Sequence, residues 1–299
     1  PVNIVFLYFI GFYILLMCLK IDPYIAILGA LAFGFSSYFF VILEAGHMSK
    51  ANAIAFMPPV IGGVVLSYRG KLLTGAAVTA LFMSLELWAN HYQVTYYMVF
   101  ILIFFGLSEL IRYIRQKKSL EFFKRSTVIF ASMLLAVLVN IGSIWGTAEY
   151  AKYTTRGKSD LSILAPGQVK KDSIDKTSGL DRSYITAWSY GYGETFTLLV
   201  PDTKGGANIK QGARIPMNQM HAKQASPEVM SKLIDETLKS STPSSKGQLV
   251  NALSNASTYW GNQGATSGPV YVGAVIILLF LLSFPFLEDK MKWFLFAVT

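Results

Sequence analysis

Long apolar runs alternate with short polar connections over residues 3–146, and a long polar stretch then precedes a final apolar region. A membrane-spanning helix needs roughly 20 apolar residues, and somewhat fewer where the bilayer thins or flanking side chains snorkel. This criterion predicts six spans in the first half of the chain, one near its end and the start of another. The expected spans are residues 3–19, 24–43, 53–68, 72–88, 94–114, 127–146 and 270–287, and a last one starting near Trp293.

The third and fourth runs, 53–68 and 72–88, are short, and the third contains the pair Pro58-Pro59. Proline removes a backbone donor and crowds the preceding helical turn, so we expect this pair to break the run. Broken or re-entrant helices are tolerated in a membrane where their backbone lines a cavity. The two short runs therefore fit re-entrant or broken helices.

The polar stretch 147–268 is long enough to form a small domain, which we expect to be mixed but mainly helical. Within it, residues 195–200 favour a strand or an apolar plug, and the Gly- and Lys-rich residues 202–211 favour a mobile loop. The expected organisation is transmembrane helices over 1–146, this domain, and C-terminal transmembrane helices over 269–299. Both ends are typical of a fragment of a longer protein.

Composition supports an all-α polytopic membrane protein. Hydrophobic residues make up 53% and charged residues only 14% of the 299 positions, whereas soluble domains carry about 25% charged residues. The 26 Lys and Arg exceed the 17 Asp and Glu, but topology explains this excess, so we expect no nucleic-acid partner. Cys18 is the only cysteine, which excludes disulfides within the chain and thiolate metal sites.

Basic residues identify the cytoplasmic side. When the connections are assigned alternately, the short loops of one side hold Lys50 alone. The other side holds Lys20, Arg69, Lys71, Arg112, Arg115, Lys117, Lys118, Lys124, Arg125, Lys290 and Lys292. By the positive-inside rule that second side is cytoplasmic. The domain 147–268 and all three histidines, at positions 47, 91 and 221, are then extracytoplasmic, so we expect the chemistry there.

The first outer turn carries Glu44, His47 and Lys50 at positions i, i+3 and i+6, with Asn52 two residues further on. A helical turn would align the first three on one face. Lys50 would then hold a lipid phosphate, while Glu44 or His47 moves a proton or orients an acceptor hydroxyl. The alternative is a polar turn in which Glu44 and Lys50 neutralise each other and His47 caps a helix.

The second outer turn repeats these residue types as Glu86, Asn90, His91 and Gln93 among aromatic residues. The aromatic residues fit an interfacial belt. Glu86 lies within an apolar span, where a carboxyl group is costly and marks a candidate site. A polar packing contact is the alternative for Glu86.

Two groups in the polar domain are candidate ligand contacts. The first is the pair Arg156 and Lys158, which would clamp phosphate oxygens or, alternatively, snorkel to the headgroups. The second group suits sugar rings, with an aromatic core as its alternative. It comprises Trp188, Tyr190, Glu194 and Trp260.

Several of these motifs together resemble the YfhO-type bacterial membrane proteins, in order and over nearly the whole chain. The first half contributes GHMSK at 46–50 through Pro58, YRGK at 68–71, and NHYQ at 90–93 with the tyrosines at 96 and 97. The second half contributes TRGK at 155–158, WSYGYGE at 188–194, YWGNQ at 259–263 and SGP at 267–269.

The resemblance implies a GT-C-type glycosyltransferase in a bacterial cytoplasmic membrane, with its site on the extracytoplasmic face. Members of this class take a sugar from a polyprenyl phosphate and pass it to a cell-envelope glycan or protein acceptor. A carboxylate activates the acceptor, while cations or a divalent metal hold the phosphate. Their main acid lies in the first outer loop, which would precede residue 1, so Glu44 is expected to be a second acid.

Two other functions fit the same features. Charged residues beside short, proline-containing segments also occur in transporters or flippases of lipid-linked or anionic solutes. A membrane scaffold that binds a partner through its outer domain is the third reading.

Overall fold

The computed structural model describes residues 2–151, 153–154, 186, 189, 191–201, 203–210, 257–259 and 270–287. The described helices and strands belong to two compact units. The first unit contains α1 (Val2–Cys18), α2 (Pro23–Gly34), α4 (Met48–Tyr68), α5 (Leu72–Trp88), α6 (Tyr92–Arg115), α7 (Ser119–Val139) and α8 (Ile141–Ala151). The second contains α3 (Ser37–Glu44), the 3-10 helix η1 (Tyr192–Leu198), strands β1 (Gly205–Lys210) and β2 (Ser257–Tyr259), and most of α12 (Ala274–Ser283).

Three described helices, α4, α6 and α7, are long and apolar enough to cross a membrane, and the number is four if α2 and α3 together count as one bent span. Helices α1 and α5, and α12 with the short η3 (Phe284–Phe286), are apolar but shorter. The protein is therefore a mainly helical, multi-pass membrane protein. The span expected at 24–43 is divided, because α2 ends at Gly34 and α3 begins at Ser37.

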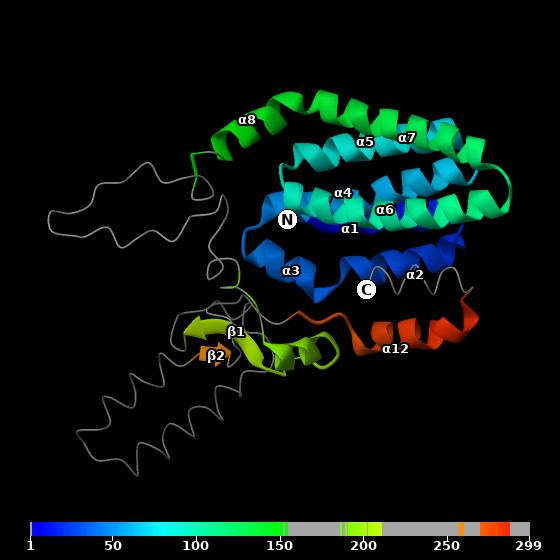
Figure 1. The fold of residues 1–299 in the computed structure, drawn as a ribbon. Helices are drawn as coiled ribbons and strands as arrows, with labels where there is room; N and C mark the ends of the chain where they lie inside the picture. Colours follow the sequence, from blue (N-terminus) through cyan, green and yellow to red (C-terminus); the bar gives the residue numbers. More distant parts are fainter. Residues whose placement is uncertain are drawn as a thin grey trace, which may run out of the picture. The chain divides into compact units, whose positions relative to one another are not determined.

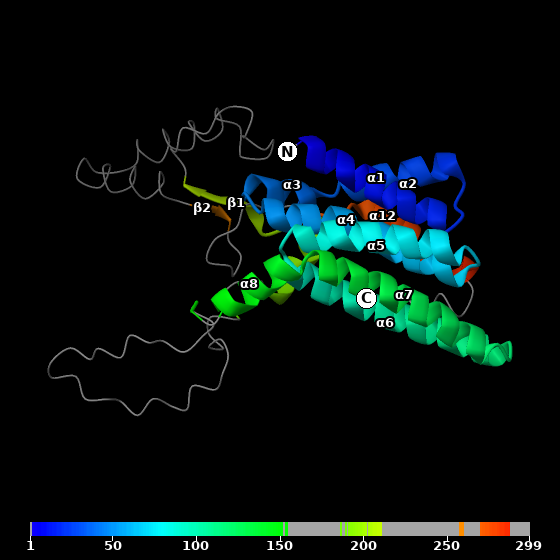
Figure 2. The ribbon, with the colours of Figure 1, turned by 90° about the horizontal axis from the view of Figure 1, so that it is seen from above.

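Helix α4 lies at the centre of the first unit, between α1 and α5 (Figures 1 and 2). Pro58 and Pro59 lie inside this continuous helix, so the expected break at the pair is wrong. Pro59 cannot donate to the carbonyl of Ala55, four residues earlier. Gly11 of α1 lies directly against that carbonyl and leaves it room. Packing by a neighbouring helix thus accommodates a proline that sequence reasoning treats as a break.

The crossing of α4 and α5 depends on small residues. Gly63 and Ser67 of α4 face Gly75 and Thr79 of α5, and a Cβ atom on Gly63 would lie 2.5 Å from the Thr79 hydroxyl oxygen. The Ser67 and Thr79 hydroxyls donate to the carbonyls of Gly63 and Gly75 in their own helices, at 3.0 and 2.9 Å. This spacing of small residues lets two membrane helices approach closely without leaving unsatisfied polar groups.

Helices α6 and α7 form an antiparallel hairpin that packs on α4 and α5 (Figure 2). The span expected at 127–146 begins earlier, at Ser119, and ends at Val139, where Asn140 separates α7 from α8. The Asn140 amide donates to the carbonyls of Ser84 and Ala136, both at 3.0 Å. A polar side chain thus ties the end of α7 to α5 at the point where the helix stops.

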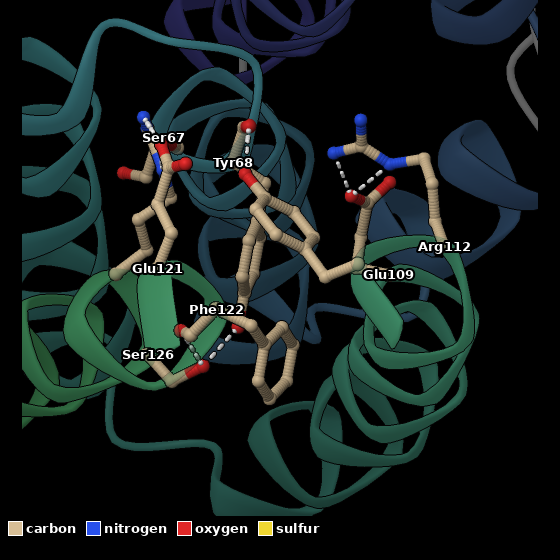
Figure 3. A network of polar contacts seen from close by, with 9 residues as sticks. Ser67, Tyr68, Glu109, Arg112, Glu121, Phe122 and Ser126 are labelled. Atoms are coloured by element: carbon tan, nitrogen blue, oxygen red, sulfur yellow. Dashed lines mark hydrogen bonds and ion pairs between the residues drawn. The ribbon is translucent and has the colours of Figure 1, made fainter. Parts of the chain in front are cut away.

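A polar and aromatic network fastens the hairpin to the C-terminal end of α4 (Figure 3). The Tyr68 hydroxyl lies 2.7 Å from the Ser126 hydroxyl, and the Tyr113 hydroxyl donates to the Tyr68 carbonyl at 2.9 Å. The Phe122 ring stacks on Tyr68 with centroids 5.5 Å apart. Arg125 donates to the Ser67 carbonyl at 2.6 Å. These contacts hold the ends of α4, α6 and α7 together.

The second unit joins segments that are far apart in the sequence. The Ser37 hydroxyl accepts from the Tyr271 backbone N–H at 2.6 Å and donates to its carbonyl at 2.8 Å. Residues 192–198 form a 3-10 helix, so the alternative of a strand over 195–200 is wrong. Residues 205–210 form a strand paired antiparallel with β2 and are not the expected loop.

Candidate functional site

The first unit has chemically different ends. At one end Arg69 donates to the Leu19 carbonyl at 3.3 Å, which brings together the C-terminal ends of α1 and α4. We call this end the basic end. It carries Lys20, Arg69, Lys71, Arg112, Arg115, Lys117, Lys118, Lys124 and Arg125. We call the opposite end, with His47, Lys50, Glu86, His91 and Thr95, the histidine end. Among the described residues, the segregation of basic residues expected from the sequence is thus present, and Lys290 and Lys292 lie outside these residues.

Glu86 is fully buried near the end of α5, with 0% of its surface exposed. Both of its carboxyl oxygens accept from the Thr95 hydroxyl of α6, at 2.8 and 2.9 Å. Among the described residues this hydroxyl is its hydrogen-bond partner, and no ion pair compensates the carboxyl group. The structure thus shows Glu86 in a polar packing contact with the first turn of α6.

The turn that Glu86 fixes presents two unsatisfied polar atoms. Nε2 of His91 and the hydroxyl of Tyr92 are buried and have no hydrogen-bond partner in the described part of the chain. Buried polar atoms in proteins are nearly always hydrogen-bonded, so an orphaned pair calls for an explanation. A ligand hydroxyl or phosphate oxygen that reached either atom would satisfy it.

The two polar turns expected on the outer side meet at His91. Burial lowers the pKa of the His91 ring, and the nearby charges of Lys50 and His47 lower it further. Two residues of the first turn therefore act electrostatically on a residue of the second. A low pKa keeps this imidazole neutral near pH 7 and able to accept a proton.

Glu44, His47 and Lys50 do not share the helical turn that their spacing predicts. Helix α3 ends at Glu44, Gly46 takes a positive φ of 78°, and α4 begins at Met48. Glu44 is exposed in the second unit, whereas His47 and Lys50 open α4 in the first. The glycine at 46 adopts a left-handed conformation that few other residues tolerate, and this conformation interrupts the expected alignment.

The remaining candidates have varied surroundings. Asn52 is half-buried in α4, and Gln93 is exposed and donates to the Tyr97 hydroxyl at 2.8 Å. Glu194 is buried and accepts from the Gly191 backbone N–H at the start of η1, which assigns it a local structural role. The other expected contacts, Arg156, Lys158, Trp188, Tyr190 and Trp260, lie outside the described residues. Within the described ranges no group of three His, Cys, Asp or Glu residues could hold a metal.

Sequence reasoning missed three residues near this end. Thr95 holds Glu86, Tyr92 contributes an orphaned hydroxyl, and Thr147 of α8 lies 3.2 Å from the side-chain oxygen of Asn90. Tyr92 is one of the aromatic residues beside His91 for which the sequence favours an interfacial belt. The sequence signal for Thr95 was its position four residues after His91, about one helical turn further along.

The meeting of the two turns predicts a specific titration. We expect His91 to titrate below the ordinary histidine value of about 6.5 and its pKa to rise in Lys50→Ala, because a like charge is removed. Since the folded-state pKa lies below the unfolded value, His91 also makes the protein less stable as the pH falls through the interval between them. NMR of ring-labelled histidine measures the pKa, with His91→Gln for assignment.

Lys71→Ala, at the basic end, is the matched control and should leave the His91 pKa unchanged. An unchanged pKa in Lys50→Ala would show that the two turns are not electrostatically coupled.

Comparison with protein-family models, with curated proteins and with solved structures finds no match for this chain. The site is therefore interpreted from its own geometry and from the motifs in its sequence.

Proposed function

We propose that this chain is a GT-C-like integral membrane glycosyltransferase with seven to eight spans, which moves a sugar from a polyprenyl-phosphate donor to an acceptor. The observation that carries the proposal is the pair of orphaned atoms on His91 and Tyr92 beside Lys50. Two motifs that resemble YfhO-type proteins, at 46–50 and 90–93, lie at this same end. The positive-inside rule favours an extracytoplasmic location for this end in a bacterial cytoplasmic membrane.

The reaction requires a phosphate site and a proton acceptor close together. The acceptor hydroxyl forms a bond to the anomeric carbon of the sugar, and the bond from that carbon to the phosphate oxygen breaks. The hydroxyl proton passes to a base, and polyprenyl phosphate leaves with the electron pair. Lys50 is proposed to stabilise the charge that develops on the phosphate. The neutral ring of His91 is proposed to take the proton.

Glu86 supports this chemistry indirectly. Its hydrogen bonds to Thr95 fix the first turn of α6 and so place His91 and Tyr92. Glu44 stays a predicted second acid, and Arg156 and Lys158 stay predicted phosphate contacts. The cell-envelope acceptor also stays a prediction.

The test is sugar transfer by the purified full-length protein in lipid nanodiscs. Polyprenyl phosphates carrying different radiolabelled sugars are supplied with cell-envelope acceptors, and labelled product is measured. We expect transfer by the wild type and a loss of roughly a hundredfold in His91→Gln, the contribution typical of a general base.

Absence of transfer with every donor, together with movement of a lipid-linked solute across vesicles, would replace the proposal with the transporter reading. Absence of both activities, together with a stable partner bound to the outer domain, would favour a scaffold.

A further inference from the structure

The connection between α6 and α7 is a rigid, strongly basic turn. Helix α6 ends at Arg115 and α7 begins at Ser119. The Lys117 and Lys118 backbone N–H groups donate to the carbonyls of Ile114 and Tyr113, both at 2.9 Å, and Lys117 has a positive φ of 57°. These contacts hold the turn in one conformation. The backbone of Lys117 and Lys118 is therefore held by hydrogen bonds.

The acidic residues near this turn are already paired. Between positions 109 and 125 there are six Lys or Arg residues and two Glu residues. Arg112 donates two hydrogen bonds to Glu109 (Figure 3). Arg125 forms an ion pair with Glu121, and its shorter contact with that carboxylate is 2.5 Å. Lys118 and Lys124 lie near enough to Glu121 to feel its charge. Even so, a net positive charge remains on the exposed residues Arg115, Lys117, Lys118 and Lys124.

Exposed apolar side chains directly adjoin these cations. Leu120 is 85% exposed and Phe123 59%, while Ile111 and Ile114 on α6 are each more than half exposed. In the most apolar stretch of each helix, only 17% of α6 and 22% of α7 is buried inside the described structure. The hairpin therefore presents an apolar surface that ends in a cluster of cations. A ligand with apolar chains and an anionic head matches this arrangement.

We propose that this basic turn, formed by Arg115, Lys117, Lys118 and Lys124, binds the phosphate of an anionic glycerophospholipid whose acyl chains lie along α6 and α7. Clusters of Lys and Arg next to a membrane helix attract anionic lipid headgroups. The exposed apolar side chains beside the cations favour a lipid over a soluble anion. The site is at the basic end, away from the histidine end, and does not depend on the proposed sugar transfer.

The chain supplies a closely matched control. Lys117 and Lys20 both have positive φ, 57° and 63°, and Lys118 and Lys71 both occupy the position before a helix, α7 and α5. The double variants Lys117→Gln/Lys118→Gln and Lys20→Gln/Lys71→Gln therefore remove the same charge from the same end at similar backbone positions. Only the first double variant changes the proposed site.

Native mass spectrometry of the full-length protein, with phosphatidylglycerol and phosphatidylcholine in equal amounts, measures the preference for the anionic lipid. We expect the wild type to prefer phosphatidylglycerol, Lys117→Gln/Lys118→Gln to lose roughly tenfold of that preference, and Lys20→Gln/Lys71→Gln to change it less than twofold. Equal losses in both variants, or none in either, would overturn the proposal. Displacement of the lipid by millimolar inorganic phosphate would overturn the assignment to a lipid.

Discussion

The Lys50→Ala variant is expected to lose roughly a hundredfold or more of the sugar-transfer rate, the cost typical of removing one preorganised charge from a transition-state site. Lys50 lies half-buried in the first turn of α4, and its positive charge lowers the pKa of His91. Lys50→Arg keeps a cation and should retain part of the rate. Transfer kinetics in nanodiscs measure both variants.

Lys71→Ala removes a lysine from the basic end and should leave the rate unchanged. A wild-type rate in Lys50→Ala would show that the phosphate is held elsewhere.

The Gly63→Ala variant is expected to destabilise the first unit by about 3 kcal/mol, the upper end of the usual cost of overpacking. The new methyl group would lie 2.5 Å from the Thr79 hydroxyl oxygen and 2.7 Å from its backbone nitrogen. Because part of that obstruction is backbone, relief requires α4 and α5 to separate. Denaturant unfolding in mild detergent measures the change.

Gly106→Ala in α6 is the matched control, since nothing lies within 4 Å of a Cβ atom there. Alanine should stabilise that helix by up to about 1 kcal/mol through its higher helix propensity. Equal effects at positions 63 and 106 would contradict the close helix crossing.

The apolar runs predicted the helices best where polar residues flank the run at both ends. The run 72–88 coincides with α5, and the basic residues of the first unit gather at one end as the loop charges predicted. Both features depend on local composition. They can be read without knowledge of the neighbouring helices.

The errors arise where a distant segment supplies the missing interaction. The pair Pro58-Pro59 is tolerated because Gly11, some 45 positions earlier, lies against the Ala55 carbonyl that Pro59 leaves free. Helix α7 stops at Asn140, whose amide binds the carbonyl of Ser84 in α5. The sequence around each position contains no sign of these partners.

Lys50, Glu86 and His91 were all expected on the outer side, and the structure places them at one end of the first unit. Glu86 makes the polar packing contact that was its alternative reading, with Thr95, and its catalytic role stays a prediction. The orphaned atoms of His91 and Tyr92 depend on packing in three dimensions, so residue type and spacing could not reveal them.

Native mass spectrometry of the full-length protein in mild detergent tests the central claim most directly, with wild type and Lys50→Ala prepared side by side. The account predicts that polyprenyl phosphate copurifies with the wild type and is lost from Lys50→Ala. Its absence from the wild type, or equal amounts in both proteins, would contradict a donor site at the histidine end.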